Sequence, residues 1–173
     1  MRAPIVKYHS KITDVYEVIL DKHEDSRGFN AEGYSKTLFE SLGFPKLNFE
    51  TDSYSISFKN SIRGFHGDFL NYKLLSAPIG RIQLFLIDRR HNFPTFNNVL
   101  EFEIDESSPR QILVPPGVMN GHACLSERCM FAYKLSARYT YPSEQNHVKW
   151  NDPIFSDIIK WKINNPILSE RDK

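Results

Sequence analysis

The sequence has no excess of charge of either sign. Its 22 Lys and Arg residues balance 21 Asp and Glu residues, so the formal net charge is +1. So close a balance lacks the electrostatic footprint of a protein that binds nucleic acid or an anionic membrane surface. No apolar run approaches the length of a transmembrane helix, and the first residues lack the apolar core of a signal peptide. We therefore expect neither nucleic acid nor membrane as a partner.

Cysteine is scarce as well. The two cysteines, Cys124 and Cys129, stand five residues apart. Two residues cannot build the crosslinked framework of a small secreted domain, and no histidines accompany them at the spacing of a zinc site. We expect two reduced thiols in a cytoplasmic protein.

Aromatic residues and prolines are plentiful, at 13% and ten residues, and they suit a turn-rich β protein. Residues 1–21 alternate loosely and predict opening strands, and 36–43 (KTLFESLG) predicts a short helix that stops at Gly43. Further strands are predicted at 54–58, 72–77, 80–88, 98–104, 111–114 and 130–139, separated by turn clusters. Many short strands predict a mainly β single domain over 1–173, a β-sandwich, jelly roll or barrel with a few short helices.

The segment SIRGFHGD (61–68) places a cation and an imidazole three residues apart. In a regular strand Arg63 and His66 would point to opposite faces, because side chains alternate with a period of two. Gly64 permits a bend that would turn both toward one anionic ligand. The ordinary alternative is a hairpin with an exposed arginine and a histidine at the core edge.

A set of motifs extends over almost the whole chain. They are, in chain order, DSRGF (25–29), NSIRGFH (60–66), a lone Lys73, IDRRHNFPTF (87–96), LVPPGVMNGH (113–122), LSE (125–127), FAYK (131–134), KWNDPIF (149–155) and LSERDK (168–173). Each motif is weak alone, but the nine in this order resemble the dTDP-4-dehydrorhamnose 3,5-epimerase family, from about Asp21 to Lys173. The resemblance implies a cupin jelly roll that epimerises a nucleotide sugar without a cofactor.

The resemblance also implies a catalytic role for four residues. His66 matches the base, Tyr133 the acid on the opposite face of the sugar, and Asp172 the partner of the histidine. Lys73 matches a lysine near the sugar carbonyl. Without the resemblance, Tyr133 would be interpreted as a packed aromatic residue, Lys73 as a solvated charge and Asp172 as part of a disordered terminus.

Further matches imply how the nucleotide is bound. Arg27 and Arg63 match arginines that bind the diphosphate, and Tyr139 falls where an aromatic side chain lies near the nucleotide. Glu32 matches a residue that reaches the nucleotide from the other subunit of a homodimer. The resemblance therefore implies a homodimer with a nucleotide-sugar substrate.

The chemistry needs these residue types. A 4-keto sugar has acidified C–H bonds at C3 and C5, and inversion requires a base on one face and an acid on the other. An imidazole titrates near neutrality, and a carboxylate partner favours its charged form. An ammonium group such as that of Lys73 stabilises an enolate oxygen. No hydride moves, so no redox cofactor is expected.

A metal is not expected either, although many cupins bind one. The metal-binding form would read H-x-H where this chain has His66-Gly67-Asp68, and would have a histidine where this chain has Asn120. His122 is interpreted as a structural or pocket-lining residue.

Three departures from the family pattern concern the substrate pocket. The family reads A-H-G-F where this chain reads MNGH (119–122), so Asn120 cannot carry the positive charge of a histidine. An aromatic after Phe29 is replaced by Asn30, and two amide side chains are replaced by the hydroxyls of Thr51 and Ser53. The acid–base residues are kept, which predicts the same reaction on a different nucleotide sugar.

The sequence resembles most the branch that acts on GDP-4-keto-heptoses in capsular polysaccharide synthesis. The dTDP-4-dehydro-6-deoxyglucose 3,5-epimerase of rhamnose synthesis is the alternative, and the inverted centre, C3, C5 or both, stays open. Two other classes stay open as well. A sugar-nucleotide 3,4-ketoisomerase should show a pair of histidines in its pocket, and a non-catalytic sugar-nucleotide-binding cupin should have lost His66 or Tyr133.

Overall fold

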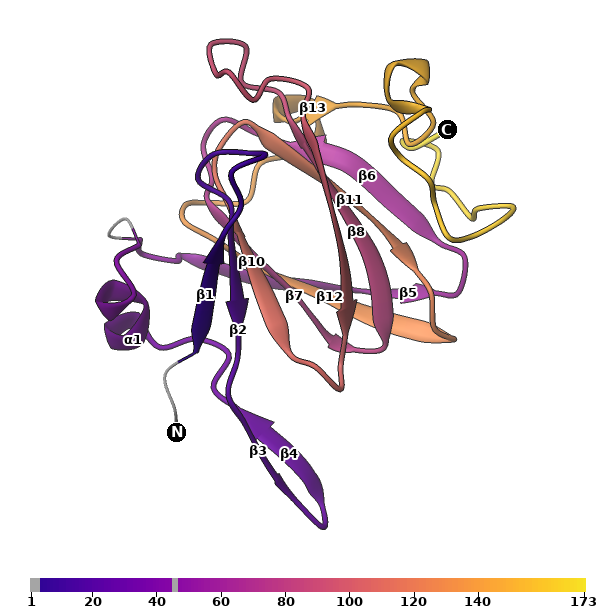
Figure 1. Cartoon of the computed structure of the whole chain (residues 1–173). Coiled ribbons are helices and arrows are strands. Elements are labelled where there is room, and N and C mark those ends of the chain that lie inside the picture. Colours follow the sequence, from indigo (N-terminus) through magenta and orange to yellow (C-terminus); the bar gives the residue numbers. More distant parts are fainter. Residues whose placement is uncertain (1–3, 45–46) are drawn as a thin grey trace.

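The computed structural model describes residues 4–44 and 47–173, and these form two antiparallel sheets packed face to face (Figure 1). The larger sheet contains, in spatial order, β1 (Ile5–Tyr8), β2 (Tyr16–Ile19), β10 (Arg110–Val114), β7 (Lys73–Ile79), β12 (Arg128–Leu135) and β5 (Thr51–Phe58). The smaller sheet contains β13 (Asn146–His147), β6 (Ile62–Gly67), β11 (Val118–Cys124), β8 (Arg81–Asp88) and β9 (Val99–Asp105). The predicted mainly β sandwich is confirmed.

The core lies between the sheets and extends behind the smaller one. Alternate residues of β8, such as Leu84 and Leu86, are fully buried between the sheets. The intervening Phe85 and Ile87 are buried on the other face, where Val148, Phe155, Ile159 and Trp161 of the C-terminal segment cover them. Burying such a side chain stabilises the fold by about 1.5–3 kcal/mol. The C-terminal segment is thus held firmly against the sheet that carries β6.

Short elements complete the chain. They are the helix α1 (Lys36–Ser41), the hairpin β3 (Lys22–Asp25) and β4 (Gly28–Ala31), and two 3-10 turns at Pro142–Glu144 and Pro153–Phe155. The predicted helix and its stop are confirmed: the Ser35 side chain accepts a hydrogen bond from Leu38 N, and Gly43 has a φ of +77°. No helix within the described residues is long and apolar enough to cross a membrane.

Most predicted strands are confirmed, but the short β13 was not predicted, and other details differ. The strand predicted at 130–139 ends at Leu135, so Tyr139 lies in a loop. The prediction missed β11, because its Asn-Gly-His sequence follows a turn and shows no apolar alternation. It also missed the hairpin β3–β4, whose residues are largely polar and exposed. Residues 1–3 of the predicted opening strands lie outside the described residues.

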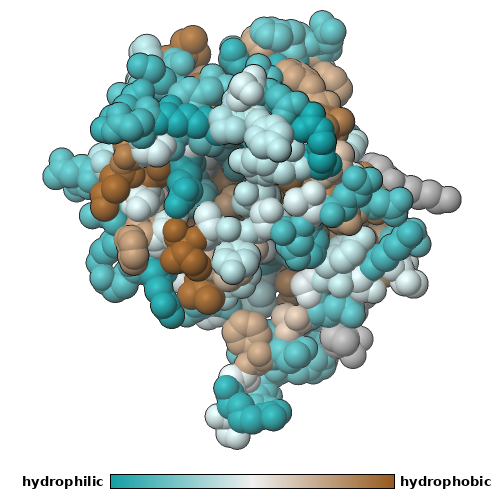
Figure 2. Space-filling model, turned by 180° about the vertical axis from the view of Figure 1, so that it is seen from behind, coloured by the Kyte–Doolittle hydropathy of each residue, from teal (hydrophilic) through white to brown (hydrophobic). Residues whose placement is uncertain are grey.

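Apolar side chains are also exposed on the surface. On β5, Tyr54, Ile56 and Phe58 are 67%, 45% and 71% exposed. The β3–β4 hairpin projects away from the sandwich in Figure 1 and stands out again in Figure 2, where apolar groups gather among polar ones above it. Both cysteines, by contrast, are buried and free, as expected for reduced thiols.

Candidate active site

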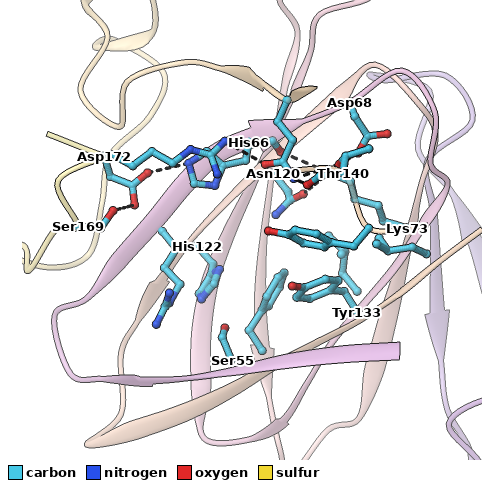
Figure 3. Close-up of a pocket in the computed structure, with 17 residues that line it drawn as sticks. Ser55, His66, Asp68, Lys73, Asn120, His122, Tyr133, Thr140, Ser169 and Asp172 are labelled. Atoms are coloured by element: carbon cyan, nitrogen blue, oxygen red, sulfur yellow. Dashed lines mark hydrogen bonds and ion pairs between the residues drawn. The ribbon is translucent and has the colours of Figure 1, made fainter. Parts of the chain in front are cut away.

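A pocket of about 260 Å³ opens between the two sheets. Its walls come from β5, β7 and β12 of the larger sheet, β6 and β11 of the smaller one, and the loops at 139–145 and 169–172. Figure 3 shows polar side chains from both sheets pointing into this space.

The bend that Gly64 permits is present. Gly64 has a φ of +120°, which favours glycine, and a Cβ there would lie 2.6 Å from Gly121 Cα of the neighbouring strand. The Gly64–Phe65 peptide bond that follows is cis. Arg63 and His66 both line the pocket, although they stand three residues apart on one strand.

His66 is paired with a carboxylate from the C-terminus. Its Nε2 lies 2.7 Å from Asp172 Oδ1, and Ser169 donates a 2.8 Å hydrogen bond to the other carboxylate oxygen (Figure 3). Burial opposes ionisation of Asp172, which is only 2% exposed, but hydrogen bonds from His66 and Ser169 outweigh it and hold its pKa below the usual range. A charged Asp172 fixes the orientation of the His66 ring through this contact.

Tyr133 faces this pair from the other sheet. It comes from β12, and its ring lies across the cavity from His66 (Figure 3). Burial raises the pKa of the Tyr133 phenol, and the hydrogen bond with Ser53 and the charge of Arg63 only partly offset that shift. Tyr133 therefore holds its proton at neutral pH and can donate it.

Lys73 is a buried cation on the pocket wall. Its Nζ donates to Asn120 Oδ1 at 3.2 Å and to the carbonyl oxygen of His66 at 3.4 Å. Burial lowers the pKa of Lys73 to about 8, although the nearby Asp68 acts in the opposite direction. The ammonium group is thus available to a developing negative charge at neutral pH.

Comparisons with known proteins agree with this arrangement. The family model of dTDP-4-dehydrorhamnose 3,5-epimerase matches residues 9–173. The chain belongs to this family of epimerases. A dTDP-4-dehydrorhamnose 3,5-epimerase of Salmonella typhimurium is 34% identical over 152 residues, which cover 86% of this chain and 81% of the relative.

Solved structures of family members have the same fold. The epimerase from Bacillus anthracis, with TDP and pyrophosphate bound, superposes with a TM-score of 0.90 at 30% identity, covering 98% of this chain and 97% of that one. The epimerase from Elizabethkingia anophelis gives 0.85 at 32% identity, with 99% and 94% covered. The chain is therefore a nucleotide-sugar epimerase of the isomerase class.

The other predicted site residues of the epimerase fall into two groups. Tyr139 and Asn120 line the pocket with Arg63. Four others do not line it. The Thr51 hydroxyl donates a hydrogen bond to Ala137 O, and Ser53 is hydrogen-bonded to Tyr133. Arg27 pairs with Asp25 at 2.6 Å in the projecting hairpin, and Glu32 follows that hairpin in the chain. Their binding roles stay predictions.

The sequence analysis missed Asp68 and His147. Asp68 is 4% exposed and accepts hydrogen bonds from Asn71 N and the Thr140 hydroxyl, so it ties the loop at 139–145 to the wall beside Lys73. His147 on β13 pairs with the backbone of His66. Asp68 lies two residues after His66 in the segment SIRGFHGD, so its closeness to the predicted base could have indicated a place in the pocket. Nothing in the sequence around His147 indicates a place in the site.

Among the residues that the structure describes, the groups best placed to hold a metal are His66, His147 and Asp172. Their ligand atoms all lie within 4.8 Å of one another. A metal there would occupy the His66 nitrogen that faces Asp172, and would thus compete with the pairing that orients the base. This geometry does not suit a metal as a helper of proton transfer.

We therefore expect that dialysis against EDTA leaves epimerisation unchanged. The metal content, measured by plasma mass spectrometry, should not correlate with activity between preparations. A stoichiometric transition metal whose removal abolishes turnover, and whose return restores it, would contradict this expectation.

Proposed function

We propose that this epimerase inverts C3, C5 or both in a nucleoside-diphosphate-4-keto sugar, by proton transfer through an enolate. The observation that carries the proposal is the placement of the His66–Asp172 pair and Tyr133 on facing sheets, with a sugar-sized space between them. His66 removes the proton next to the carbonyl, and the electron pair moves onto the carbonyl oxygen, which Lys73 stabilises. Tyr133 protonates the same carbon from the opposite face.

The proton balance closes without a cofactor. His66 becomes an imidazolium beside the charged Asp172 and later loses its proton to solvent. Tyr133 becomes a phenolate and takes a proton from solvent, since the pocket is open to water. The carbonyl is restored when the carbon is protonated, so nothing is oxidised or reduced.

For the substrate, we propose a GDP-4-keto-heptose. The supporting observations are the departures from the family pattern: Asn120 is the hydrogen-bond partner of Lys73, and Ser53 is bonded to Tyr133. The second candidate is dTDP-4-dehydro-6-deoxyglucose, which the names of the relatives favour.

Solvent exchange in D₂O tests the reaction and the substrate together. GDP- and dTDP-linked 4-keto sugars are incubated with the protein, and mass spectrometry counts the deuterons that each gains. One deuteron would indicate a single inverted centre and two would indicate both. Exchange into the dTDP sugars alone would favour the second candidate, and no exchange into any of them would refute the proposed function.

A sugar-nucleotide ketoisomerase is less well supported by the pocket. The pocket does contain a second histidine, His122, as that alternative requires. Burial lowers the pKa of His122 to about 3, and the charge of Arg63 adds to the effect. So weakly basic an imidazole is a poor proton acceptor at neutral pH, which favours the pairing of His66 with Tyr133. A non-catalytic role is disfavoured because both residues are present.

The pKa of Lys73 leads to a pH prediction. The ammonium form is the one that stabilises an enolate, and it is lost as the pH rises through about 8. We expect kcat/KM to fall above that pH. Tyr133 cannot account for this limb, because burial raises its pKa above the usual value near 10.

The measurement is the pH profile of kcat/KM in the wild type and in Lys73→Arg. Arginine stays charged throughout this range. The residual activity of the variant should therefore lack the alkaline limb. An identical limb in both proteins would assign it to another group.

We further propose a homodimer in which each pocket is completed by the partner. The Arg27 side chain is 88% exposed at the tip of a hairpin that projects from its own chain, and β5 presents an exposed apolar face. We expect a dimer mass in light scattering. Mixing inactive Arg27→Ala and His66→Asn chains should restore activity, because one pocket of the mixed dimer then has both residues intact. A monomeric, fully active protein would contradict this proposal.

A further inference from the structure

His122 lies in the pocket without a hydrogen-bond partner. It comes from β11 and is 2% exposed, and its ring stacks on Phe131 with centroids 4.1 Å apart. Neither ring nitrogen is hydrogen-bonded to the protein, although a buried polar group without a partner normally costs free energy. The ring lines the cavity and has unused hydrogen-bonding capacity, but both nitrogens are shielded from water in this structure, so a ligand reaches one of them only when the ring turns toward it.

The ring is neutral and so differs in role from His66. Burial lowers the pKa of His122 to about 3, and the charges of Arg63 and His66 reinforce the shift. A neutral imidazole has one donor and one acceptor nitrogen. A hydroxyl group can pair with either of them, whereas a phosphate or carbonyl oxygen can pair only with the donor. Its chemistry is thus that of a binding group for a hydroxyl.

The position of His122 selects which hydroxyl. Asn120, which contacts Lys73, and His122 stand two residues apart on β11, a separation of about 7 Å. Figure 3 shows His122 and Lys73 on opposite sides of the pocket. If the C4 carbonyl faces Lys73, as the proposed function requires, the far side of the sugar ring faces His122. There C1 carries the diphosphate, and C2 carries the nearest free hydroxyl.

We propose that His122 is a substrate-binding residue that hydrogen-bonds to the C2 hydroxyl of the sugar. The bound hydroxyl gives the buried ring its missing partner. A sugar without that hydroxyl leaves the nitrogen unpaired, so the pocket discriminates against 2-deoxy sugars. This assignment rests on the proposed function for its orientation of the sugar.

The test compares ligands that bind but have no keto group to react. Calorimetry measures the dissociation constants of GDP-mannose and dTDP-glucose, their 2-deoxy analogues, and GDP and dTDP alone. The variant is His122→Phe, which keeps a ring to stack on Phe131 and removes both nitrogens. His91→Phe is the matched control, since His91 is exposed, lies against the Phe96 ring in a tilted arrangement and is outside this pocket.

We expect His122→Phe to weaken binding of the hydroxylated sugar nucleotide about 5- to 150-fold. Binding of the 2-deoxy analogue and of the free nucleotide should change less than about twofold, and His91→Phe should change nothing. The melting temperature of the ligand-free variant should not fall, because the substitution removes an unsatisfied buried group. A merely structural histidine would lower that temperature and leave the ligand ratios unchanged.

Other outcomes overturn the assignment. Equal weakening of the free nucleotide would place His122 on the diphosphate, and equal weakening of the 2-deoxy analogue would place it on another group. Dissociation constants that are the same in His122→Phe and the wild type would show that His122 does not bind the ligand. A wild type that binds these ligands but exchanges no deuterium into 4-keto sugars would refute the proposed function separately, and one that binds none of them would overturn both.

Discussion

His66→Asn is expected to abolish the exchange of the substrate's α-proton with solvent, by about 10²–10⁴-fold or more. Asparagine is shorter than histidine, so Asp172 loses the contact with Nε2 but keeps the hydrogen bond from Ser169. The amide cannot accept a proton at neutral pH, and no enolate forms without that step. The measurement is deuterium incorporation in D₂O, followed by mass spectrometry.

Binding separates this effect from a loss of folding. The nucleotide should bind to His66→Asn with near-native affinity, because the predicted diphosphate contact comes from Arg63 on the far side of the bend. The variant should also melt near the wild-type temperature. Near-native wash-in of deuterium by His66→Asn would show that another group is the base, and the nearby His147 would be the first to examine.

Tyr133→Phe is expected to separate exchange from inversion. The substitution removes one hydroxyl and keeps the ring, which packs against the core cluster that contains Phe131. The His66–Asp172 pair is untouched, so proton removal continues. The enolate can then be reprotonated only from the original face or by water, and inverted product should fall by roughly 10²–10⁴-fold.

Two readouts on one sample check this expectation. Mass spectrometry counts the deuterons gained, and NMR of the recovered sugar measures the fraction with inverted configuration. A parallel loss of exchange and inversion would mean that Tyr133 supports binding or the base. Unchanged product formation would make it one more aromatic residue of the β core.

The prediction from sequence succeeded where local pattern and tertiary environment agree. Strands such as β8 and β10 are apolar and bounded by turns, and they were found to within a few residues. It failed for β11, whose Asn120 and His122 are polar because they face the pocket and not the core. A strand that serves a binding site loses the alternation by which strands are recognised.

The sequence by itself determined the mainly β fold and the family, because these depend on composition and motif order. It left the bend at Gly64 open, because glycine permits a bend without requiring one. Only the tertiary structure decided which ionisable groups meet in the pocket and in which direction their pKa values shift. Asp172 stands next to last in the chain, yet the docking of the C-terminal segment buries it against His66. The pKa values of Lys73 and His122 are both lowered by burial, and burial depends on residues distant in sequence that no local pattern records.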